Sequence, residues 1–141
     1  MNGHSGAQDD WAQRLKSELR NLKAVKPDRL VQIADQAGKE LRPIKMNQIR
    51  RFLDGVRRLE SKQKGSQAHV ADLQADLHML RPKLAYAVGR ADQREKPHFV
   101  ALMNILDPAI QAAAEDPKEC FDKLLRLVEG IIAYHRFHGG N

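Results

Sequence analysis

The sequence has very few of the residues that would indicate a disulfide framework, a β-sheet or a membrane span. It contains one cysteine in 141 residues, which excludes an internal disulfide and a cysteine-based zinc site. It contains no threonine and no sustained alternation of polar and apolar residues, so strands are not expected. No run of 18 apolar residues occurs and the start has no apolar segment, so we expect neither a membrane span nor a secretory signal. A cytoplasmic location is the simplest expectation for such a chain.

Signatures of the common enzyme classes are also missing. The sequence has no phosphate-binding loop, no dinucleotide-binding glycine motif and no nucleophile-elbow motif, so we expect no catalytic residue and no cofactor. Two helical groups contain histidine: His69 with Asp72 and Asp76, and His135 with His138. Neither group has a known zinc motif or a nearby cysteine, so we expect no metal site. A metal-assisted hydrolase that uses the first group remains an alternative, which metal analysis would test.

A helical pattern runs along the whole chain. Six prolines divide it at intervals that are typical of helices. The clearest apolar stripe has helical spacing and comprises Ile49, Phe52, Leu53, Val56 and Leu59. The segment after Pro117 is apolar around more than half of its circumference and is predicted to be the central helix. The sequence therefore predicts an all-α fold, a compact single-domain bundle of about six helices over residues 9–141, behind a disordered tail at residues 1–8.

Four single positions carry more specific expectations. We expect a kink or a break at Pro82, followed by a short helix over residues 83–91. Tyr86 and Tyr134 lie in apolar stretches and are predicted to be core or near-core residues. Cys120 lies at a helix start, where a low-pKa thiol is conceivable, but no partner is identifiable and a structural thiol is expected.

The positive charge is concentrated in one segment. The net charge is +6, and residues 45–64 alone contribute +5, from seven Lys or Arg against two Asp or Glu. Residues 97–141 are slightly acidic, at −2. Such an asymmetry indicates an anionic partner for the basic segment and makes the acidic third a candidate protein-contact surface.

The basic side chains of this segment lie off the apolar stripe of a predicted helix. Six of the seven, namely Lys45, Arg50, Arg51, Arg57, Arg58 and Lys62, are called the basic ridge here. Positions 50 and 57 are seven residues apart and share a face, as do positions 51 and 58. Guanidinium groups pair with phosphate oxygens, so the ridge can follow a nucleic-acid backbone. The alternative is a solvated helix face with internal ion pairs to Asp54 and Glu60. Aromatic residues make up 5% of the chain, so recognition by base stacking is poorly supported.

Three segments in order resemble a known family. They are QIRRF at residues 48–52, LRPKLAYAVGR at residues 80–90, and LVEGIIAYHR at residues 127–136, which Gly139 and Gly140 follow. Their order and spacing resemble the small subunit of the type III-A CRISPR effector, the Csm complex. The resemblance covers roughly residues 40–140.

The resemblance implies a non-catalytic, all-α subunit that acts in antiviral defence. Copies of such subunits stack head to tail into an inner filament, beside the backbone subunits that hold the crRNA and cleave the target. The filament lines the path of the target RNA and binds RNA without strong sequence preference. Gly130 stands where the family often has a larger residue such as Ala, and is expected to loosen its helix by about 1 kcal/mol.

The expected partners are therefore the backbones of target RNA and crRNA, other Csm subunits and copies of the chain itself, with a dimer of the free protein left open. The candidate nucleic-acid-binding residues are Lys45, Arg50, Arg51, Arg57, Arg58, Lys62, Lys83 and Arg90. Of these, four lie in the segments that carry the resemblance: Arg50, Arg51, Lys83 and Arg90. The alternative function is a protein-binding helical adaptor with no nucleic-acid role, in which the ridge meets an acidic protein surface.

Overall fold

The computed structural model describes residues 3–64 and 69–141, and all the regular structure in these residues is helical. The helices are α1 (Gly3–Arg20), a 3-10 turn η1 (Leu22–Ala24), α2 (Pro27–Glu40), α3 (Met46–Gln63), α4 (Val70–Arg90), α5 (Lys96–Glu115) and α6 (Pro117–Phe137). The predicted all-α bundle of about six helices is therefore confirmed.

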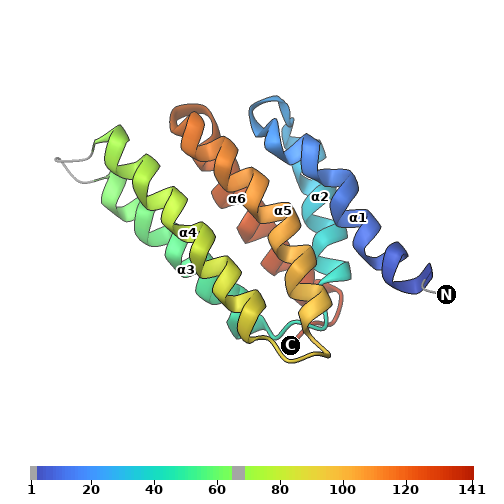
Figure 1. Cartoon of the computed structure of the whole chain (residues 1–141). Coiled ribbons are helices and arrows are strands. Elements are labelled where there is room, and N and C mark those ends of the chain that lie inside the picture. Colours follow the sequence, from blue (N-terminus) through green and yellow to red (C-terminus); the bar gives the residue numbers. More distant parts are fainter. Residues whose placement is uncertain (1–2, 65–68) are drawn as a thin grey trace.

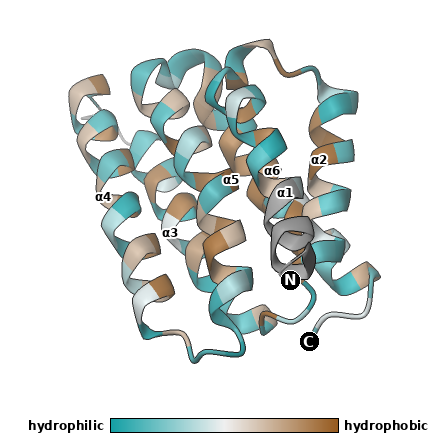
Figure 2. Ribbon diagram, turned by 45° about the vertical axis from the view of Figure 1, so that its right-hand side comes forward, coloured by the Kyte–Doolittle hydropathy of each residue, from teal (hydrophilic) through white to brown (hydrophobic). Residues whose placement is uncertain are grey.

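The helices form two stacked layers of three. Helices α1, α5 and α4 make one layer and α2, α6 and α3 make the other, with α5 and α6 in the middle of each (Figure 1). Helix α5 packs on α6 between the layers, and α3 packs on α4 at one edge of the molecule. The last helix is thus central, as predicted, and it shares this position with α5. Figure 2 shows the hydrophobic residues gathered on these middle helices and on the inner faces of the others.

One contiguous cluster of buried side chains holds the layers together, and it includes residues of every helix. The predicted stripe of α3 belongs to it: Ile49, Leu53 and Val56 are buried, and Phe52 and Leu59 are half-buried against it. Because this stripe faces inward, the charged residues of α3 are left on its two flanks and its outer face.

The helix boundaries differ from the prediction at two places. Helix α4 runs from Val70 to Arg90 through Pro82, so the predicted short helix over residues 83–91 is the end of α4. A proline removes one backbone hydrogen bond, and the neighbouring turns hold the helix together. Helix α1 begins at Gly3, whereas the sequence predicts the start of the bundle at residue 9. A helix can extend by a further turn without burying side chains. A hydrophobic pattern therefore does not predict such an extension. Residues 1–2 of the predicted tail lie outside the described residues.

Helices α2 and α6 approach each other closely at two glycines. A Cβ atom on Gly130 would lie 2.8 Å from the Cβ of Ala34, and one on Gly38 would lie 2.6 Å from the backbone nitrogen of His135. Gly130 is therefore also a packing residue, because the missing side chain makes room for α2.

The two histidines at the end of α6 reach across to other parts of the fold. The Nε2 atom of His135, which is fully buried, lies 2.6 Å from the carbonyl oxygen of Ile44. The Nε2 atom of His138 lies 2.6 Å from Oδ1 of Asp35 in α2. These bonds tie the end of α6 to α2 and to the connection that leads into α3, so they help to place the start of the basic helix.

Candidate nucleic-acid interface

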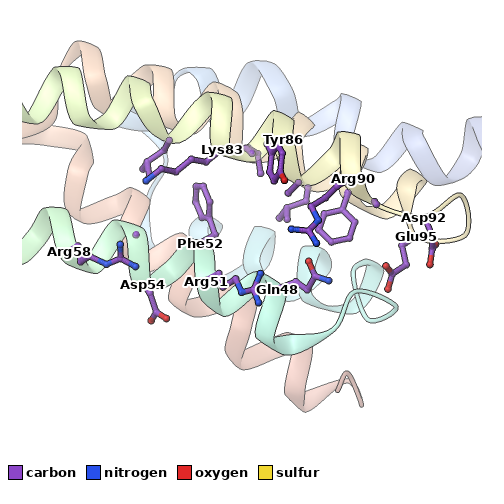
Figure 3. Close-up of a pocket in the computed structure, with 17 residues that line it drawn as sticks. Gln48, Arg51, Phe52, Asp54, Arg58, Lys83, Tyr86, Arg90, Asp92 and Glu95 are labelled. Carbon is purple, nitrogen blue, oxygen red and sulfur yellow. The ribbon is translucent and has the colours of Figure 1, made fainter.

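An open groove of about 610 Å³ lies between α3 and α4, at the edge of the bundle. Arg51 and Arg58 line it from α3, and Lys83 and Arg90 line it from α4 (Figure 3). On each helix the two cations are seven residues apart, so they stand two turns apart on the same face. The groove thus brings together residues that are up to about forty positions apart in the sequence.

The floor of the groove is apolar and belongs to the core. Leu80 and Leu84 of α4 are buried there, and Phe52 of α3 is half-buried. A Cβ atom on Gly55 would lie 3.4 Å from Cδ2 of Leu80, so the two helices are in close contact at this point. The position of each wall is therefore fixed by core packing, and the cations project from rigid helices.

The four cations of the groove are exposed, and within the described part of the chain none of them has a carboxylate at ion-pair distance. Three carboxylates also line the groove. Figure 3 shows Asp92 and Glu95 together at one end and the side chain of Asp54 turned away from α4. Asp92 accepts a hydrogen bond at 2.8 Å from the backbone N–H of Glu95, which fixes the turn before α5. The middle of the groove is therefore positively charged.

Tyr86 lies on the α4 wall of this groove and is 67% exposed, so the prediction that it is a core or near-core residue is wrong. Tyr134, by contrast, is half-buried against the core. Tyr86 follows the buried Leu84 by two positions, which turns it about 200° away from the inward face. The spacing of the buried leucines in α4 was the sequence signal that could have located it.

The other half of the basic ridge faces α6. Arg50 and Arg57 line a smaller hollow of about 310 Å³ with Glu129 and Ile132 of α6. Nη2 of Arg57 lies 3.1 Å from Oε2 of Glu129, while Arg50 is exposed with no ion-pair partner among residues 3–64 and 69–141. The ridge is therefore divided between two flanks of α3, and only the flank with Arg51 and Arg58 meets α4.

The remaining two ridge residues lie at the ends of α3. Lys45 is exposed immediately before the helix. Nζ of Lys62 lies 2.8 Å from Oδ2 of Asp76 in α4, and this hydrogen bond raises the pKa of Lys62. The predicted internal partners of the ridge, Asp54 and Glu60, form no ion pair within the described residues. Of the eight candidate residues, two are thus engaged in pairs between helices.

The carboxylates of the acidic C-terminal third are largely engaged inside the molecule. Oδ1 of Asp107 lies 2.7 Å from Nε of Arg81, and Oδ2 of Asp116 lies 3.5 Å from Nζ of Lys23. Glu115 pairs with Arg20, which lowers the pKa of that carboxyl group. Most acidic side chains of this third therefore form ion pairs that join helices.

The candidate metal ligands do not converge. Among the described residues no group of three or more His, Cys, Asp or Glu side chains is placed to hold a metal ion. Asp76 of the predicted cluster with His69 and Asp72 is paired with Lys62. In the same part of the chain, no helix has the length and the apolar character that crossing a bilayer requires.

Most of the chain matches a known protein family. The family model described as Csm2 Type III-A matches residues 24–141, and so includes both walls of the groove and all eight candidate residues. Helix α1 lies outside the matched region. No curated protein matches the chain.

Proposed function

The chain belongs to the Csm2 family, the small subunits of type III-A CRISPR effector complexes, and we propose that it binds the backbone of RNA in the groove between α3 and α4. Members of this family are structural subunits that take part in a Csm complex with other subunits. We also propose that the chain is non-catalytic and that its copies stack along the RNA.

The observation that carries this proposal is the convergence of four cations without carboxylate partners. Arg51 and Arg58 approach from one helix, and Lys83 and Arg90 from the other. Phosphate oxygens are the natural partners of such groups, because each contact is charge-assisted and releases condensed counterions. Three of the four, Arg51, Lys83 and Arg90, also lie in the segments that resemble the family.

The groove contacts the backbone, and base pairing with the guide supplies sequence specificity. In this mechanism the chain neutralises phosphates and holds the RNA in line, and catalysis is performed by other subunits. Copies of the chain stack along the RNA, so that several grooves act on one strand and weak single contacts add up through avidity.

A salt titration with matched charge variants tests the proposal. Affinity for an unstructured single-stranded RNA is measured over a range of salt concentrations for the wild type and for Arg51→Gln/Lys83→Gln. The variant should bind more weakly, and the slope of log K against log salt should become shallower by about 0.7 for each lost phosphate contact. The control is Lys16→Gln/Lys26→Gln, which removes the same charge from exposed positions on α1 and before α2.

Equal losses in the two double variants would mean that only net charge matters, and the groove assignment would fail. An affinity that does not change with salt would also contradict it. Assembly with other Csm subunits that proceeds without RNA and is blocked by Arg51→Gln/Lys83→Gln would favour the protein-binding adaptor.

A further inference from the structure

We propose that Tyr86 stacks against an unpaired RNA base, so that the groove prefers RNA with unpaired bases to a continuous duplex. The inference rests on the proposed function and goes beyond it, because phosphate contacts alone do not distinguish a single strand from a duplex. It assigns the groove a second kind of contact, which the low aromatic content of the sequence did not lead us to expect.

The first support is the placement of the ring. Tyr86 is 67% exposed on the wall that also presents Lys83 and Arg90, one turn on either side of it along α4. Its hydroxyl group has no hydrogen-bond partner within the described residues. Neither core packing nor a hydrogen bond therefore accounts for a large aromatic side chain at this position.

The second support is the neighbouring guanidinium group. The Cζ atom of Arg90 lies 5.8 Å from the centroid of the Tyr86 ring, within the range of a cation–π contact. This contact lies on one side of the ring, and the exposed area is left for a planar ligand. A base on Tyr86 would lie on the wall that carries Lys83 and Arg90, in the groove that Arg51 and Arg58 line from α3 (Figure 3).

The chemistry of the groove defines the ligand as an unpaired nucleotide of any base. Every base has a π-face, so stacking on a tyrosine tolerates any sequence. In an A-form duplex the faces of the bases are covered by their neighbours, so only unpaired bases can reach a protein ring. The groove thus combines a cationic track with one aromatic platform, which is the arrangement used for single strands.

The test compares three variants on three RNAs. The variants are Tyr86→Leu, Tyr86→Phe and, as the control, Phe137→Leu, which removes an exposed aromatic ring outside the groove. The RNAs are a single strand, an abasic strand of the same length and a duplex of the same length. Tyr86→Leu should weaken single-strand binding about fivefold or more while the salt slope stays unchanged. Tyr86→Phe and Phe137→Leu should bind like the wild type, because neither removes the platform.

The abasic strand supplies the decisive comparison. The wild type should prefer the normal strand to the abasic strand and the duplex, and Tyr86→Leu should lose this preference. If Tyr86→Leu binds all three RNAs like the wild type while Arg51→Gln/Lys83→Gln flattens the salt slope, stacking is refuted and the backbone proposal stands. If Tyr86→Leu disturbs assembly of the Csm complex but not RNA affinity, Tyr86 is a protein contact and the inference fails. If the wild type binds no RNA, the proposed function itself has failed.

Discussion

A close approach between two helices of this molecule depends on residues that have no side chain. Gly38 and Gly130 lie where α2 and α6 meet, and a methyl group on either would collide with backbone or Cβ atoms of the other helix. Such contacts allow no adjustment, because the atoms involved belong to the rigid part of each helix. The distance between α2 and α6 is therefore set at these two positions.

Replacing Gly130 by alanine should destabilise the protein. Alanine favours a helix by about 1 kcal/mol over glycine, but crowding against Ala34 costs about 1 to 3 kcal/mol. Urea denaturation followed by circular dichroism measures the net effect. The control is Gly89→Ala in α4, where a Cβ atom would meet nothing within 4 Å. This substitution should therefore stabilise the fold. An increase in stability for Gly130→Ala equal to that for Gly89→Ala would contradict the packing role.

The thiol of Cys120 should be unreactive in the native protein. Burial raises the pKa of Cys120, so the thiolate fraction at neutral pH is smaller than that of a free cysteine. A thiol reagent at pH 7.5 should label the folded chain slowly and the urea-unfolded chain quickly. Rapid labelling of the folded chain would revive the low-pKa alternative.

At the scale of elements, ion pairs join helices that are distant in sequence. Glu18 of α1 accepts two hydrogen bonds from Arg29 of α2, at 2.7 Å and 2.8 Å. Arg57 and Lys62 connect α3 in the same way to α6 and α4. These charged residues fasten helices, whereas the four cations of the groove form no ion pair within the described residues.

The Glu18–Arg29 pair should make stability depend on pH. The hydrogen bonds from Arg29 lower the pKa of Glu18, so the contribution is complete above the usual value of 4.5 and disappears as pH falls through the lower native value. Because both side chains are partly exposed, we expect Glu18→Gln to cost about 0.5 kcal/mol at pH 7 and nothing at pH 2. Denaturation at both pH values checks this, with Glu40→Gln, at an exposed position of α2, as the control. A cost that persists at pH 2 would show that the ion pair is not its source.

Helix α3 shows which structural features the periodicity of the sequence predicts. Its apolar stripe and the alternation of its arginines over two faces were predicted correctly, because both follow from 3.6 residues per turn. Periodicity did not predict which face of α3 meets α4 and which meets α6, because this depends on the helices that pack beside α3. As a result, Arg57 is paired with Glu129, whereas Arg51 lines a groove with residues more than thirty positions away.

At the scale of the whole molecule, every helix contributes to one buried cluster. A chain of this size with one contiguous core should unfold in one step. We expect the fluorescence of Trp11, the single tryptophan, and far-ultraviolet circular dichroism to report the same urea midpoint. Because Trp11 reports on α1 and circular dichroism on all helices, two separate midpoints would show that α1 unfolds independently.

The sequence by itself determined the all-α class, the inward face of α3 and the concentration of positive charge in one segment. These properties are local, since they depend on residues within a few turns of one another. Tertiary structure alone decided that Lys83 and Arg90 join Arg51 and Arg58 in one groove, and that Tyr86 is exposed beside them. It also decided that the acidic residues of the C-terminal third neutralise cations elsewhere in the chain. The physical reason is that packing brings together helices distant in sequence, and only their arrangement determines which charges are paired and which remain free to bind.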